Sequence, residues 1–200
     1  MKNKKRPFEY FYFMMNKAHG EVCSTVSDLS VTVFSHFTEK ELLSNNVKLH
    51  TIGRLDKDTT GLLLFTNDGF LSNFLTRPEN KIEKTYFVTL KNKVSLLEQK
   101  EYSLKAKKGL TLLPEKKALE QKSAGAVIKW QKENECFITV TEGKFHEVKR
   151  IFLALGNEVT SLKRINFAGV TLDPSLQEGK WRALTSEELE ILQAPCTKEK

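Results

Sequence analysis

Two carboxylates, Asp56 and Asp58, are the residues of this 200-residue chain with the clearest potential for chemistry. They lie in residues 50–69, which read HTIGRLDKDTTGLLLFTNDG, and Arg54 precedes Asp56 by two positions. An ionised carboxylate can act as a nucleophile, a general base or a metal ligand. Since a loop that leads into a rigid strand often carries function, Asp56 is a candidate catalytic residue, and a turn-capping role for either aspartate stays open.

Two metal-dependent patterns overlap with this segment. Residues 56–61 begin like an EF-hand calcium loop, but the twelfth position, where a bidentate glutamate is needed, is Asn67. The same residues give the D-x-D-x-T pattern of aspartate-based phosphatases, which need a preceding apolar strand and a downstream acidic pair for magnesium. A charge and a glycine interrupt that approach, and Asp68 and Asp173 each stand alone. Calcium is therefore disfavoured, and a magnesium-dependent phosphohydrolase built on Asp56 and Asp58 stays an alternative.

The charge of the chain favours a polyanionic partner. Its formal net charge is +7, with 40% hydrophobic and 28% charged residues. Lysine and arginine contacts to phosphates release counterions and favour binding, although positive charge also serves solubility. Basic residues gather at three places: Lys2, Lys4, Lys5 and Arg6; Lys105, Lys107 and Lys108; and Lys144, Lys149, Arg150, Lys163 and Arg164.

Cysteine usage and hydropathy indicate a cytoplasmic protein. Cys23, Cys136 and Cys196 are widely spaced and odd in number, which argues against a disulfide framework or a zinc site. Apolar runs such as residues 62–65 are too short to span a bilayer, and no cleavage site follows the basic N-terminus. We therefore expect no membrane association and no structural metal.

Apolar patterning predicts the elements that must position Asp56. Expected strands are residues 8–15, 62–65, 85–90, 126–130 and 136–141, with more near 159–172. Expected helices are residues 38–44, opened by a Thr38–Glu41 capping box, 70–76, 93–108, 146–155 and one that starts at a Thr185–Glu188 capping box. Strands outnumber helices and most connections are short. The pattern predicts an α+β fold with a largely antiparallel sheet flanked by helices.

Five segments, in order along the chain, resemble a known family. They are residues 12–17 with 22–25 (YFMMNK, VCST), 53–69 (GRLDKDTTGLLLFTNDG), 83–88 (EKTYFV), 142–150 (EGKFHEVKR) and 179–185 (GKWRALT). Together they resemble the pseudouridine synthases of the RsuA group, which modify ribosomal RNA. The resemblance spans nearly the whole chain and implies the pseudouridine synthase fold, a mixed and largely antiparallel sheet with a central catalytic cleft.

The resemblance also implies catalytic roles. Asp56 would attack the target nucleotide or abstract a proton from its sugar, while the uracil is detached through N1 and rejoined through C5. Lys149, with Arg150 as the other candidate, would hold the carboxylate ionised where water is excluded. Tyr86 would stack on the flipped base and take the C5 proton, although an ordinary strand aromatic is the alternative. No metal or organic cofactor is implied.

Basic residues of the matched segments are candidates for RNA contacts. Arg54 would occupy the gap left by a flipped uridine, or pair with Asp58 or Glu83. The remaining candidates would contact the phosphate backbone, or be solvated charges: Lys17, Lys84, Lys144, Arg150 and Arg164.

The expected organisation is a basic arm at residues 1–7, a catalytic domain at 8–194 and a polar tail at 195–200. Members of the group usually begin with a small S4-type RNA-binding domain, which is not expected in these 200 residues: either the natural protein lacks it, or the chain is a truncated version. The expected partner of the monomer is ribosomal RNA or a ribosomal assembly intermediate, with 16S RNA favoured by the details of residues 22–25, 84–86 and 146–150. The alternatives are the same reaction on 23S RNA and a non-catalytic RNA-binding assembly factor.

Overall fold

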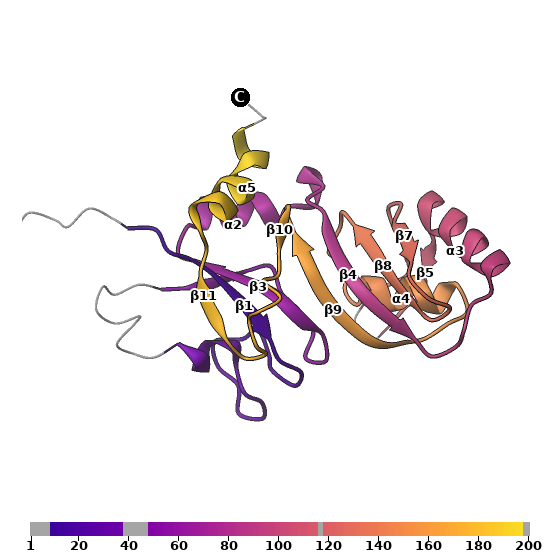
Figure 1. Ribbon diagram of the computed structural model, residues 1–200, viewed down its shortest axis with the longest axis horizontal. Helices are drawn as coiled ribbons and strands as arrows, with labels where there is room; N and C mark the ends of the chain where they lie inside the picture. The colour runs from indigo at the N-terminus through magenta and orange to yellow at the C-terminus, as the bar shows by residue number, and fades with distance from the viewer. Residues whose placement is uncertain (1–8, 38–47, 116–117, 198–200) are drawn as a thin grey trace, which may run out of the picture.

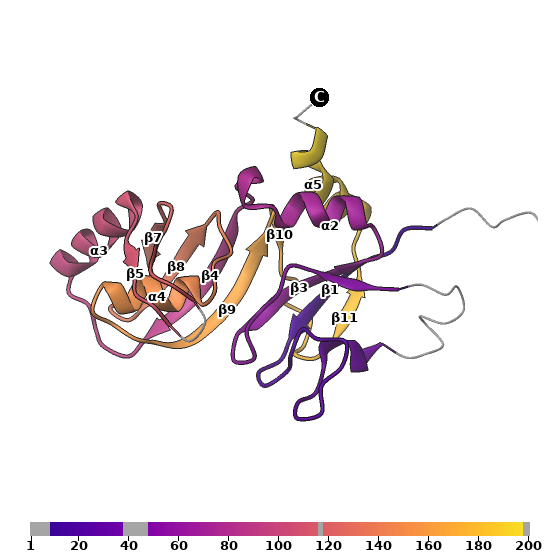
Figure 2. The ribbon, with the colours of Figure 1, turned by 180° about the vertical axis from the view of Figure 1, so that it is seen from behind.

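One nine-stranded sheet runs through the molecule and carries both of its halves (Figure 1). The computed structural model describes residues 9–37, 48–115 and 118–197. Strands follow the order β11-β1-β3-β9-β4-β8-β7, with β2 paired to β3 and β10 to β9. Figure 2 shows from behind that β9 lies between the two groups of strands and joins them.

The strands are β1 (Tyr12–Lys17), β2 (His50–Ile52), β3 (Thr60–Thr66), β4 (Lys84–Leu90), β5 (Thr111–Leu112), β6 (Gln121–Lys122), β7 (Val127–Trp130), β8 (Glu135–Val140), β9 (Val159–Phe167), β10 (Val170–Thr171) and β11 (Trp181–Ala183). The helices are the short η1 (Val33–His36) and η2 (Pro78–Asn80), and α2 (Gly69–Thr76), α3 (Leu96–Lys108), α4 (Glu147–Ala154) and α5 (Ser186–Thr197). Strands β5 and β6 form a separate two-stranded sheet.

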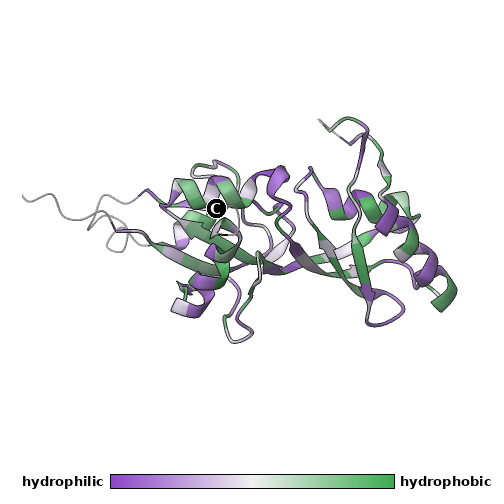
Figure 3. Cartoon of the chain, turned by 90° about the horizontal axis from the view of Figure 1, so that it is seen from above, coloured by the Kyte–Doolittle hydropathy of each residue, from purple (hydrophilic) through white to green (hydrophobic). Residues whose placement is uncertain are grey.

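The first half is built on β1 and β3, whose apolar runs are buried on both faces. Leu62 and Leu64 face a cluster that includes α2 and α5 residues such as Leu75 and Leu192. Leu63 and Phe65 point to the other face, because side chains alternate along a strand, and pack in a second cluster. In Figure 3 these strands are largely green, the colour of hydrophobic residues. A strand covered on both faces explains why the sequence shows a continuous apolar run.

The second half is built on β4, β8 and β7, in which β8 lies between β4 and β7 and is antiparallel to both. One face of this group forms an apolar cluster with α3 and α4, in which Val88, Ile138 and Phe152 are fully buried. Helix α3 begins with a capping box formed by Ser95 and Glu98. It lies against β7 at the far end of the molecule from β11 (Figure 1).

The two halves meet where β3 runs parallel to β9, with Thr60 opposite Lys163 and Gly61 opposite Arg164. A side chain at Gly61 is excluded, because a Cβ there would lie 2.3 Å from the Arg164 carbonyl oxygen, and φ is +95°. The close approach brings the loop that precedes β3 directly beside β9. This loop contains Asp56.

The predicted α+β class and the mixed, mostly antiparallel sheet are confirmed. The helices expected at 70–76, 93–108 and 146–155 correspond to α2, α3 and α4, and the 185–188 capping box opens α5. The helix expected at 38–44 lies outside the described residues. The chain expected to be a polar tail from residue 195 is still helical to Thr197, since Cys196 packs against the apolar cluster under α5.

The sequence pattern did not predict several short strands. Strands β2, β5, β6 and β11 have two or three residues each, too few to show alternation. In the described part of the chain, none of the helices is long and apolar enough to cross a membrane.

Candidate active site

Asp56 lies in the loop between β2 and β3, and several contacts fix the backbone of that loop. Leu55 is buried in the apolar cluster of the first half, and its amide donates to Cys23 Sγ at 3.4 Å. The amide of Thr59 donates to the Asp56 carbonyl at 3.1 Å. The ammonium group of Lys17 donates to the carbonyls of Ala18, Lys57 and Thr59 at 3.0, 3.3 and 2.8 Å. The carboxylate therefore extends from a rigid base.

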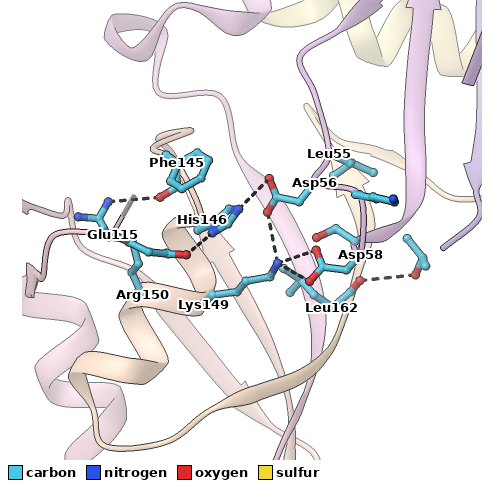
Figure 4. Close-up of polar contacts among 12 residues, drawn as sticks. Leu55, Asp56, Asp58, Glu115, Phe145, His146, Lys149, Arg150 and Leu162 are labelled. Atoms are coloured by element: carbon cyan, nitrogen blue, oxygen red, sulfur yellow. Dashed lines mark hydrogen bonds and ion pairs between the residues drawn. The ribbon is translucent and has the colours of Figure 1, made fainter. Parts of the chain in front are cut away.

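Two cationic or titratable groups from the segment that opens α4 reach the Asp56 carboxylate (Figure 4). Lys149 Nζ lies 3.6 Å from Oδ2, and His146 Nε2 lies 3.7 Å from Oδ1. The Asp56 side chain is one-third exposed, whereas those of Lys149 and His146 are 22% and 14% exposed. The structure thus brings Asp56 and Lys149 together, as the sequence predicts, across 93 positions of the chain.

Lys149 is shared between two aspartates. Its ammonium group donates to both oxygens of Asp58, at 2.6 and 2.8 Å, and is closer to them than to Asp56. Burial alone would raise the pKa of the Asp58 carboxyl, but the hydrogen bonds and charge of Lys149 hold it below its usual range. Asp58 therefore stays anionic and keeps the lysine in front of Asp56.

His146 is a site residue to which the sequence analysis assigned no role. Its Nδ1 lies 2.8 Å from Glu115 Oε1, and the Phe145 ring stacks on it with centroids 3.8 Å apart. The backbone of His146 is left-handed, with φ of +49°, at the residue that caps α4. The position of His146 in the 142–150 segment could have marked it as a site residue. Nothing in the sequence could have marked Glu115, because it lies outside every matched segment.

Asp56 borders a pocket of about 330 Å³ between the two halves, within the usual size range of small-molecule sites. Tyr86, Val148, Leu162 and Phe167 give it apolar walls. Burial raises the pKa of the Tyr86 hydroxyl, and the neighbouring Arg164 guanidinium opposes that rise. Tyr86 thus shares a pocket with the catalytic candidate Asp56, and it is neutral at physiological pH. Within the described residues, no group of three or more His, Cys, Asp or Glu is arranged to hold a metal.

Three of the expected RNA contacts border this pocket with their side chains at least partly accessible. Arg54 is exposed beside Asp56. Lys144 forms an ion pair with Glu142 and is 19% exposed. Lys84 donates to the Ile82 carbonyl at 2.8 Å, and burial first, then Arg164, lower its pKa to about 8.

The other three expected RNA contacts are buried in the protein. Lys17 is 0% exposed and holds the Asp56 loop through the three carbonyls described above. Arg150 is 2% exposed, and its guanidinium donates to four backbone carbonyls, those of Leu112, Leu113, Leu119 and Phe145. Arg164 is 1% exposed. A phosphate cannot reach the first two groups without disrupting these bonds, so the predicted phosphate contacts of Lys17 and Arg150 give way to structural roles.

A pocket between two sheet halves, bordered by a carboxylate and a half-buried tyrosine, with a lysine beside the carboxylate, is the arrangement expected of a pseudouridine synthase. The family model for RNA pseudouridylate synthases matches residues 11–154. The chain belongs to this family and is an isomerase of the pseudouridine synthase type.

The relatives agree with this assignment over most of the chain. A Bacillus subtilis (strain 168) protein described as an uncharacterized RNA pseudouridine synthase, YtzG, is 38% identical over 189 residues, which are 94% of this chain and 75% of the relative. The ribosomal small subunit pseudouridine synthase A of Haemophilus influenzae is 41% identical over 90% of this chain and 73% of the relative. That of Escherichia coli K12 is 40% identical over 89% and 72%.

A solved structure described as a pseudouridylate synthase has a TM-score of 0.81 and 41% identity, and covers 92% of this chain and 74% of that chain. A more distant structure, of a Cbf5-Nop10-Gar1 complex, has a TM-score of 0.54 at 15% identity. The second likeness concerns the fold alone.

Proposed function

We propose that this protein isomerises one uridine of small-subunit (16S) ribosomal RNA to pseudouridine, with Asp56 as the catalytic carboxylate. The observation that carries the proposal is the carboxylate itself, fixed at the edge of the pocket and flanked by Lys149 and His146. The choice of 16S RNA is supported by relatives described as ribosomal small subunit pseudouridine synthases.

The reaction needs no change in composition. The bond between C1′ and N1 of the uridine breaks, and a bond between C1′ and C5 forms after the base has turned. C5 loses a proton and N1 gains one, so that product and substrate are isomers. An anionic Asp56 attacks the nucleotide or removes a proton from its sugar, and Lys149 favours the anion. Tyr86 stacks on the base and is the candidate acceptor of the C5 proton.

RNA binding is assigned to the accessible cations around the pocket. Arg54, exposed beside Asp56, would take the place of the flipped uridine in the RNA stack. Lys144 and Lys84 border the same pocket and would contact the nearby phosphates or sugar. We further propose that the protein acts as a monomer in the cytoplasm, on ribosomal RNA or an assembling subunit, without a metal or organic cofactor.

The test is an Asp56→Asn variant, which keeps the shape of the side chain and removes its charge. Pseudouridines are mapped in ribosomal RNA from cells without the gene, and from the same cells complemented with wild-type protein, Asp56→Asn or Glu133→Gln. Glu133 is a matched control, since it is 62% exposed, paired with Lys93 and remote from the pocket. We expect one 16S pseudouridine to disappear with the gene and to return with wild-type protein and the control only.

A purified Asp56→Asn protein should still bind the RNA, and its rate of pseudouridine formation should fall by at least about a thousandfold. Normal modification by this variant would refute the assigned chemistry. A missing pseudouridine in 23S RNA would move the substrate to the large subunit. If no pseudouridine depends on the gene, while the protein binds ribosomal RNA, the non-catalytic assembly role is supported instead.

A further inference from the structure

Two residues that line the catalytic pocket each have a buried side-chain polar atom without a hydrogen-bond partner. Among the described residues, three buried side-chain polar atoms lack a hydrogen-bond partner: Asn16 Oδ1, Thr59 Oγ1 and Arg164 Nη2. Thr59 and Arg164 both line the pocket, whereas Asn16 does not. Buried donors and acceptors are nearly always satisfied, because an unmade hydrogen bond costs about 1–3 kcal/mol. Two such atoms at one pocket indicate that its ligand completes their hydrogen bonds.

Arg164 is held in place by the rest of its side chain. Its Nε donates to the Leu62 carbonyl at 2.8 Å, its guanidinium carbon lies 5.1 Å from the centre of the Phe167 ring, and the guanidinium also interacts with the neighbouring Tyr86 hydroxyl. The backbone of Arg164 is fixed against Gly61 by the parallel pair that joins the two halves. The orientation of the guanidinium is thus set by the fold before any ligand binds, which is the condition for a preorganised donor.

The uracil base offers the matching chemistry. Its polar edge has carbonyl oxygens at C2 and C4, which are acceptors, with an N–H donor between them. Building on the proposed function, we propose that Arg164 contacts the base and not the phosphate backbone: its Nη2 donates a hydrogen bond to a carbonyl oxygen of the target uracil. Thr59 lines the same pocket, and its Oγ1 can accept from the base N–H or donate to the other carbonyl of the base.

The position of Arg164 gives this contact two consequences. Nη2 has less than 1 Å² of accessible surface, so the groups that cover it have to move when the base makes this contact. When the bond to C1′ breaks, negative charge spreads onto the carbonyl oxygens of the uracil, and a fixed cation stabilises that charge more than the ground state. Cytosine has an amino group in place of the C4 oxygen, so a donor aimed at that oxygen would reject it.

A chemical double-mutant cycle tests the contact. The substrate is a 16S RNA fragment with the mapped target uridine, prepared with uridine, 2-thiouridine or 4-thiouridine at that position, because sulfur is a poorer acceptor than oxygen. Single-turnover rates are compared for wild type, Arg164→Gln, Arg164→Lys and the remote control Lys93→Gln, whose lysine is 79% exposed. All three substrates meet the same enzyme sample, so partial unfolding of a variant cancels in the ratios of their rates.

We expect one of the two sulfur substitutions to slow wild type and the Lys93→Gln control by about tenfold or more. The same substitution should slow Arg164→Gln less than about twofold, and Arg164→Lys, which lacks the planar fork, should behave similarly. Equal slowing of wild type and both Arg164 variants by each sulfur substitution overturns the contact while leaving the proposed function intact. If wild type leaves the unmodified uridine unchanged, the proposed function fails, and this inference falls with it.

Discussion

Glu147 provides a test of the electrostatics of the pocket that does not depend on RNA. This carboxyl group borders the pocket at the first residue of α4 and is 6% exposed. Burial first, and then the negative charge of Glu142, raise its pKa to about 7, with Lys144 acting in the opposite direction. We predict that Glu147→Gln stabilises the protein at pH 8 and has little effect at pH 4.5, because glutamine resembles the neutral acid.

The sign and size follow from proton linkage. Between the ordinary pKa of 4.5 and the folded value of about 7, the folded protein binds more protons at Glu147 than the unfolded chain. The contribution of Glu147 to stability is therefore fully present below pH 4.5, falls as the pH rises to about 7, and stays low above it. At about 1.4 kcal/mol per pH unit, the full loss is roughly 3 kcal/mol.

Urea unfolding followed by circular dichroism at pH 5, 6, 7 and 8 measures this difference, provided that the denaturant slope is the same for both proteins. Groups that titrate alike in wild type and variant cancel in the difference of their free energies of unfolding. The exposed Glu133→Gln is the control and should give a difference that does not change with pH. A constant difference for Glu147→Gln over this range, or a variant less stable than wild type at pH 8, would refute the reasoning.

Two further predictions concern a buried cation and a close contact between strands. Arg150→Met should lose roughly 3 kcal/mol of stability, because four carbonyls lose their donor, whereas Arg54→Met should change stability by less than about 0.5 kcal/mol. In salt titrations of RNA binding, Lys144→Met, which removes a proposed phosphate contact, should reduce the slope by about one, and Arg150→Met should leave it unchanged; the reverse result would contradict both assignments. Gly61→Ala should lose at least about 2 kcal/mol in urea unfolding, because its Cβ would meet the Arg164 carbonyl, whereas Gly69→Ala, with open space around it, should lose none. Equal stability of the two alanine variants would show that β3 and β9 can separate.

The sequence predicted the parts of the fold whose physical signal is local. Residues 62–65 form an uninterrupted apolar run, and the structure buries all four of them in β3. Residues 146–155 place apolar side chains at helical spacing, and α4 occupies 147–154. In the matched segments, the order of motifs also predicted that Asp56 and Lys149 meet, which no local pattern could show.

The sequence could not predict the direction in which a charged side chain points. Lys149 and Arg150 are neighbours in α4, and successive residues of a helix point about 100° apart. The structure turns Lys149 toward Asp58, whereas Arg150 is buried against the carbonyls of Leu112, Leu113 and Leu119. Composition counts both as positive charge available to RNA, because it records the charge of a residue and not its surroundings.

Two buried cations that the sequence suggested for phosphate contacts, Lys17 and Arg150, support the site from inside the protein. Lys17 fastens the carbonyls of the loop that carries Asp56. Arg150 fastens the carbonyls of Leu112, Leu113 and Leu119, on either side of Glu115, and Glu115 in turn holds His146 beside Asp56. Lys17 thus fixes the loop of Asp56 in the first half of the molecule. Arg150 fixes the segment of Glu115 in the second half, and through it the position of His146.

This arrangement explains why buried charge is kept in a protein of this size. Replacing a buried cation by an apolar residue often costs little when its partners are removed as well, but here the partners are backbone carbonyls that no substitution can remove. A single lysine or arginine side chain can donate to several carbonyls of an irregular segment at once. The regular backbone pairing of a strand or helix cannot satisfy such carbonyls. The loops that surround Asp56 can therefore be both irregular in backbone and fixed in position, as a site that must hold one nucleotide between two halves requires.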